Sequence, residues 1–97
     1  MMGDIKQLMK LQQQAKQIQS KLENLHIESE VNGCTVTIDA AMNIIDMQIS
    51  DEAWTQGKKV AETSIKEATQ KAMKKAQQVA AENMKDVMGG LGLPNIG

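Results

Sequence analysis

The first 25 residues carry apolar positions at helical spacing. Between Asp4 and Leu25 these positions are separated by steps of 3, 4, 3, 4 and 3 residues, which is the a/d pattern of a coiled coil. The apolar seam consists of Leu8, Leu11, Ala15, Ile18, Leu22 and Leu25. The pattern predicts a helix over 4–25, capped by Asp4. So narrow a seam indicates that the helix packs against a helical partner.

From His26 onward the period changes to two, which is typical of half-buried strands. Residues 27–31 and 34–39 alternate apolar and polar positions on either side of Asn32-Gly33, a dipeptide typical of a two-residue type I′ hairpin. A looser turn over 40–43 leads to a third strand, 44–50, in which Ile45, Met47 and Ile49 share a face. Residues 26–50 therefore predict an antiparallel three-stranded sheet with one apolar and one acidic face.

The remaining residues, 51–88, read as helical. Ser50 or Asp51 is a suitable N-cap, and Gly57 is expected to separate a short helical turn from a long helix. The long helix carries an apolar stripe of mostly small residues, which permits close approach to another helix or to a sheet. The stripe consists of Ala61, Ile65, Ala68, Ala72, Ala76, Val79 or Ala80, Met84 and Val87. Gly89-Gly90 is expected to end this helix, and 89–97 to form a flexible tail.

These elements predict one small α+β domain over residues 1–97, in the order helix, three-stranded antiparallel sheet, long helix (αβββα). The chain has no Phe or Tyr and a single Trp, so its core must be built from aliphatic side chains, Met and Ala. Eight methionines could form an adaptable binding surface, but we expect Met42, Met47, Met73 and Met84 to fill gaps in that core and Trp54 to anchor the packing beside the sheet. So small a core favours self-association.

Charge is divided into three blocks along the chain. Residues 1–25 carry four Lys and two acids, a net of +2; residues 26–52 carry six acids and no Lys, a net of −6; residues 53–97 carry seven Lys and four acids, a net of +3. The predicted helices are therefore basic and the predicted sheet is acidic. A polyanion would be attracted to the helices and repelled by the sheet.

Candidate catalytic chemistry is sparse. The single Cys, Cys34, falls on the apolar face of its strand and reads as an inert core thiol, and the single His, His26, lies at a helix–strand junction. One Cys and one His do not make a zinc site, and no glycine loop precedes a helix to bind phosphate. We therefore expect no enzyme activity, metal or cofactor. No apolar run reaches the length of a membrane span and no signal peptide is evident, so a cytoplasmic location without membrane contact is expected.

Lysine is the residue that points to a nucleic-acid partner. The chain has no Arg, so it lacks the usual bidentate reader of guanine, and its Lys side chains would meet phosphate as point charges that carry little sequence information. Away from the apolar positions, the helices carry Lys6, Lys10, Gln13, Gln17, Lys21, Lys71, Lys74, Lys75 and Lys85, which are the candidate DNA-binding residues. Such faces are also ordinary solvated surfaces, and a dimer would double their number.

The order of these segments resembles the YbaB/EbfC family of nucleoid-associated proteins along nearly the whole chain. The residues that carry the resemblance are Gly3–Lys10, Gln12–Lys16, Gly33–Ile38, Ile44–Ile49, the run Ala68, Ala72, Lys75 and Ala76, and the tail Gly89–Pro94. One departure is the turn Asp39–Asn43, which lacks a glycine that the family often has there.

The resemblance implies a tweezer-like homodimer in the nucleoid that binds double-stranded DNA with low or modest sequence specificity and influences gene expression and nucleoid organisation. We assign the dimer interface to Leu8, Leu11, Ala15, Ile18, Leu22, Ile65, Ala68, Ala72 and Ala76. Two alternatives stay open. One is a prefoldin-like holdase, against which three strands and a short first helix count; the other is an adaptor for recombination or replication proteins without direct DNA contact.

Overall fold

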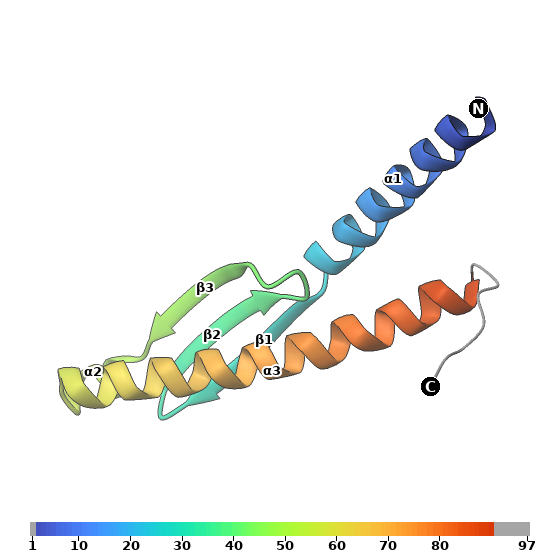
Figure 1. The fold of residues 1–97 in the computed structure, drawn as a ribbon. Coiled ribbons are helices and arrows are strands. Elements are labelled where there is room, and N and C mark those ends of the chain that lie inside the picture. The colour runs from blue at the N-terminus through green and yellow to red at the C-terminus, as the bar shows by residue number, and fades with distance from the viewer. Residues whose placement is uncertain (1, 91–97) are drawn as a thin grey trace.

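The chain folds in the predicted α+β order of helix, three-stranded antiparallel sheet and long helix (Figure 1). The computed structural model describes the backbone of residues 2–90 and the side chains of residues 4–86. The elements are α1 (Met2–Glu23), β1 (His26–Val31), β2 (Cys34–Asp39), β3 (Ile44–Ile49), α2 (Asp51–Thr55) and α3 (Lys58–Gly90). The strands lie in the order β1-β2-β3, and the molecule measures 64 × 26 × 16 Å. Of the flexible tail expected over 89–97, Gly89 and Gly90 are helical instead, and residues 91–97 lie outside the described residues.

The hairpin between β1 and β2 is confirmed. Asn32 and Gly33 both have positive φ, 49° and 81°, as a type I′ turn requires. Val31 is therefore paired with Cys34 and Ile27 with Ile38, which sets the apolar side chains of both strands on one face. Cys34 is buried, as expected.

The second turn, between β2 and β3, shifts the register of the third strand. A bulge at Thr37/Ile38 places Ile44, rather than Ile45, opposite Ile38. The sequence pattern assigns Ile44 to the other face, because alternation alone does not reveal a bulge. Met42 in this turn has a φ of 72°, a left-handed conformation that glycine adopts at lower cost.

The core lies between α3 and the first two strands. Ala68, Ala72 and Ala76 are 0% exposed and pack with Val36 and Ile38 of β2. Their small side chains let the helix approach the sheet closely. These three alanines, which the sequence pattern assigns to a dimer interface, are thus covered by the sheet of their own chain, and no surface of theirs is left for a second copy. Ile65, from the same assignment, is half-buried.

Helix boundaries follow the predicted signals with two corrections. Ser50 caps α2 as expected, and Gly57, with a φ of 107°, separates α2 from α3. Asp4, expected as the N-cap of α1, instead lies in its first turn, where a carboxylate still favours the helix dipole. The helix α3 does not end before Gly89-Gly90 but runs to Gly90.

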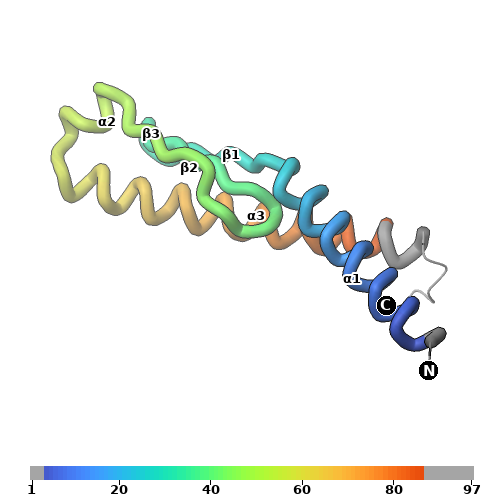
Figure 2. Tube along the Cα trace, turned by 90° about the horizontal axis from the view of Figure 1, so that it is seen from above, coloured from blue at the N-terminus to red at the C-terminus, as the bar shows by residue number. Residues whose placement is uncertain are grey.

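Several apolar side chains expected in the core are on the surface instead. One helix, about 10 Å across, covers about two strands spaced about 4.8 Å apart. The helix α3 lies on one side of the sheet (Figure 2) and runs along β1 and β2, so the third strand is left uncovered (Figure 1). Its apolar side chains are substantially exposed: Ile44 55%, Ile45 48%, Met47 43% and Ile49 37%. Met42, Met73, Met84 and, at 66%, Trp54 are also exposed, so neither the gap-filling methionines nor the tryptophan anchor is found.

Candidate nucleic-acid interface

One lysine face lies along α1. Lys6, Lys10 and Lys21, with Gln13 and Gln17 between them, recur at steps of three or four residues, so they share one side of the helix. All five side chains are exposed. The apolar seam of α1 follows the same spacing on a different side, with Leu8 and Leu11 59% and 61% exposed. The charged and apolar surfaces of α1 are therefore separate.

A second group of lysines lies on α3. Lys71, Lys74, Lys75 and Lys85 are exposed, but they belong to two parts of the helix. Ala72 and Ala76 are still buried on the sheet, so Lys71, Lys74 and Lys75 lie on the solvent side of the stretch that covers the sheet. Lys85 alone of this group lies beyond the last of these buried alanines. The four candidate lysines of α3 therefore do not form one compact group.

The two helices leave the sheet at the same end and diverge (Figure 1). They contact each other to a limited extent. Toward the sheet, Ile18 and Leu22 of the seam become half-buried, whereas Leu8 and Leu11 at the outer end stay exposed. The lysines thus form two separate surfaces, one on each helix.

Within the described side chains, none of these lysines forms an ion pair with a carboxylate. Among the side chains of residues 4–86, the one ion pair joins Lys58 Nζ to Glu62 Oε1 at 4.0 Å, near the start of α3. Both side chains are well exposed, so this pair contributes little to stability. Each candidate lysine is thus available to an external anion.

Three acidic residues of the strands, Glu28, Glu30 and Asp46, lie on the face of the sheet that turns away from α3. The strand register sets Glu28 beside Thr37 and Thr37 beside Asp46, and sets Glu30 beside Thr35. These side chains alternate with the buried ones, so they point to solvent. The predicted acidic face is present, and it lies on a different element from either lysine group.

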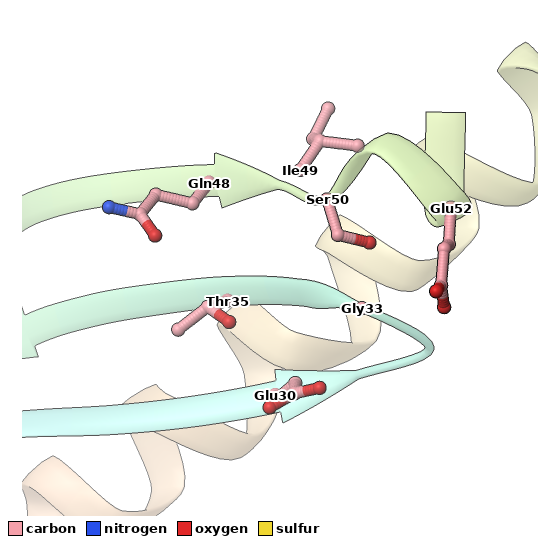
Figure 3. Close-up of a pocket in the computed structure, with 7 residues that line it drawn as sticks. All are labelled: Glu30, Gly33, Thr35, Gln48, Ile49, Ser50 and Glu52. Atoms are coloured by element: carbon pink, nitrogen blue, oxygen red, sulfur yellow. The ribbon is translucent and has the colours of Figure 1, made fainter. Parts of the chain in front are cut away.

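A shallow hollow of about 440 Å³ lies at the hairpin end of this acidic face (Figure 3). Its walls come from all three strands and from α2, and its charged residues are Glu30 and Glu52. The other lining residues are Gly33, Thr35, Gln48, Ile49 and Ser50. Two carboxylates and no basic group make the hollow repulsive to phosphate, so it is not part of a nucleic-acid interface.

The described part of the chain does not bring catalytic or metal-binding side chains together into a site. Cys34 is 0% exposed beneath α3, and His26 is exposed at the start of β1. No group of three or more His, Cys, Asp or Glu side chains in the described residues could hold a metal ion. None of the helices in this part of the chain combines the length and the hydrophobicity of a membrane span.

Comparison with known proteins decides the family. A sequence model of the YbaB/EbfC DNA-binding family matches residues 1–91. The chain belongs to this family. Proteins similar to it include nucleoid-associated proteins of Methylocella silvestris, 32% identical over 97% of this chain and 91% of the relative, and of Granulibacter bethesdensis, 34% identical over 95% of this chain and 89% of the relative.

A solved structure shares the fold of this chain. The crystal structure of an uncharacterized protein from Helicobacter pylori superposes with a TM-score of 0.60 and covers 87% of this chain and 96% of that protein. Its sequence identity is 17%, so the likeness concerns the fold alone.

Sequence reasoning missed one surface, the exposed apolar side chains of β3. The alternation at Ile45, Met47 and Ile49 is plain in the sequence, but alternation alone predicts a buried face. The signal that could have found this surface is the width of a helix, since one long helix covers about two of three strands.

Proposed function

We propose that the protein binds double-stranded DNA as a homodimer, with low or modest sequence specificity, and acts in the nucleoid. The relatives in Methylocella and Granulibacter, which are named nucleoid-associated proteins, support the location and the kind of partner. Influence on gene expression and nucleoid organisation would follow from such binding.

The observation that carries the proposal is the set of exposed lysines on two helices, none of which forms an ion pair among the described side chains. The candidate lysines of α1 and α3 are exposed, and the one ion pair among described side chains involves Lys58 instead. Lysines that contact phosphate release condensed counterions, so the affinity should fall steeply as salt rises. With no Arg in the chain, contacts of this kind read little sequence.

Two exposed apolar surfaces support the homodimer. The seam of α1 keeps Leu8 and Leu11 about three-fifths exposed, and the apolar side chains of β3 are more than one-third exposed. A monomer of 97 residues gains stability by covering such surfaces with a second copy. The dimer interface in this proposal includes Leu8, Leu11, Ala15, Ile18 and Leu22 together with β3.

The outer end of α1 also favours the holdase alternative. Ile5, Leu8, Met9 and Leu11 are each 58–61% exposed, and an apolar helix tip is a surface that unfolded chains bind. Suppression of aggregation of an unfolded client, unchanged by added DNA, would support this alternative.

The test is a gel-shift titration against random and genomic duplexes at two salt concentrations. The variant Lys71→Gln/Lys74→Gln should bind more weakly on every duplex, and the slope of log affinity against log salt should become shallower by about one for each phosphate that the variant no longer neutralises. The matched control is Lys58→Gln/Lys59→Gln, which removes the same charge from the same helix at its far end. Equal weakening in both variants, or none in either, would contradict this interface.

A further inference from the structure

The α1 helix is anchored to the body of the protein chiefly at its C-terminal end. Its side chains are exposed from Asp4 to Gln13, and it makes limited contact with α3. Only Asn24 and Leu25 separate it from β1. The direction of the helix must therefore be set by contacts near Leu22 and Leu25.

Those contacts come from the turn between β2 and β3. The backbone N–H of Ala40 donates to the carbonyl oxygens of both Leu22, at 3.1 Å, and Leu25, at 2.9 Å. Ala40 is 2% exposed, so these bonds are shielded from water. A segment fifteen or more residues downstream thus holds the C-terminal end of α1 in place.

The turn itself is held by a clasp between Asp39 and Asn43. The carboxylate of Asp39 accepts a hydrogen bond from the backbone N–H of Asn43 on Oδ1 and one from its side-chain amide on Oδ2, both at 2.9 Å. The Asp39 N–H donates back to the Asn43 carbonyl at 2.9 Å, and Met42 N–H donates to the Asp39 carbonyl at 3.0 Å. Asp39 is 2% exposed, which is unusual for a carboxylate that forms no ion pair within the described residues.

The clasp also compensates for backbone strain. Met42 is held at a φ of 72°, which costs about 1 kcal/mol or more for a side chain other than glycine. Without the two Asp39 side-chain bonds, the turn would relax and Ala40 would no longer face both carbonyls of α1. Asp39 lies on neither lysine face, so this role is distinct from contact with DNA.

We propose that Asp39 is a positioning residue. With Asn43 it closes the turn between β2 and β3, and this turn fixes the direction of α1. The lysines of α1 and α3 are thereby kept in the arrangement that binds DNA. This inference rests on the proposed function for its DNA readout, whereas the direction of α1 can be measured without DNA.

The experiment measures the spread of distances between the two helices. Spin labels are placed at Gln7→Cys on α1 and Gln77→Cys on α3, both exposed, in a Cys34→Ala background. Labelled protein is diluted with unlabelled protein so that a dimer carries one labelled copy. Asp39→Ala should broaden the distance distribution between labels and weaken duplex binding about five-fold, as expected if the competent arrangement is populated about one-fifth of the time.

Two further variants separate positioning from charge and from misfolding. Asp46→Ala removes an exposed carboxylate from the neighbouring strand, so it changes net charge equally while leaving the turn intact. The exchange Asp39→Asn/Asn43→Asp keeps an acceptor for the N–H of residue 43 and a donor–acceptor pair between the side chains. This exchange should restore both the narrow distribution and the affinity.

The outcomes distinguish this inference from the proposed function. A folded Asp39→Ala protein with an unchanged distance distribution, or with the affinity of Asp46→Ala, would overturn the positioning role. So would a folded exchange variant that restores neither property. Failure of the unsubstituted protein to bind duplex would instead overturn the proposed function, and the distance measurement would still decide whether the clasp orients α1.

Discussion

The backbone nitrogen of Ser50 lies 2.9 Å from the carbonyl oxygen of Gly33, and this hydrogen bond joins the β1–β2 hairpin to the start of α2. The hydroxyl of the same serine accepts a hydrogen bond from the N–H of Ala53 at 3.1 Å and caps the helix. One residue thus connects the sheet to the helical half of the chain. Substitutions on either side of this contact should therefore lower the free energy of unfolding of the whole protein.

Gly33→Ala should be more destabilising than Gly57→Ala. Both glycines have positive φ, 81° and 107°, so an added Cβ is strained in either place. At Gly33 the Cβ would also collide with the Ser50 hydroxyl, whereas at Gly57 no heavy atom lies within 4 Å. Urea denaturation should show a loss of about 2 kcal/mol or more for Gly33→Ala and about 1 kcal/mol for Gly57→Ala. Equal losses would mean that the contact with Ser50 relaxes freely.

Ser50→Ala should lower the free energy of unfolding by about 1 kcal/mol, because Ala53 N–H loses its capping acceptor. Ser20→Ala, on the exposed surface of α1, is the control and should change stability by less than about 0.5 kcal/mol. Thermal unfolding followed by circular dichroism measures both. If Ser50→Ala leaves the stability unchanged, water must replace the serine hydroxyl as the acceptor for Ala53 N–H.

Ala72→Leu should lower the free energy of unfolding, because the larger side chain pushes α3 away from the sheet. Ala72 is 0% exposed against β2, so the added atoms have no space, and overpacking of this kind costs about 1–3 kcal/mol. Met73→Leu, one residue along and 40% exposed, should be nearly neutral. Chemical denaturation at several protein concentrations is the measurement. If Ala72→Leu altered only the dimer equilibrium, the alanine would be acting between copies rather than within one.

Acid should selectively weaken the Asp39 clasp. Burial raises the pKa of this carboxyl, but the hydrogen bonds from Asn43 and Ala41 and the charge of His26 together outweigh burial and lower the pKa below its ordinary 3.8. The carboxylate therefore stabilises the fold above about pH 3.8, and this contribution is lost as the pH falls through the lowered pKa. Asp39→Asn should cost about 2 kcal/mol at neutral pH and progressively less below pH 3.8.

The control for this pH series is Glu28→Gln, which alters an exposed carboxyl on the outer face of the sheet. Its difference from the unsubstituted protein should stay small throughout. A constant penalty for Asp39→Asn at every pH would show that shape rather than charge holds the turn.

The sequence predicts features that a characteristic residue signals and misses those that no residue signals. Asn32-Gly33 demands a particular turn, and Ser50 is a suitable cap wherever a helix follows, so both are predictable. The clasp between Asp39 and Asn43 is not, since the turn that holds Met42 at positive φ carries no glycine to indicate it.

The same limit applies to the candidate site. Helical spacing correctly puts the lysines away from the apolar stripe, and all are exposed. The positions of the strand ends along α3 decide which lysines lie beyond the sheet. This alignment is a tertiary contact that helical spacing does not reveal. Lys74 lies over the sheet and Lys85 beyond it, although both belong to one continuous helix.

The chain has one tryptophan and no tyrosine, and that tryptophan is 66% exposed on α2. Near-ultraviolet emission from the protein therefore originates from a single indole in contact with water. A blue shift on mixing with any binder would report that this end of the molecule has become covered, without a dye or a label.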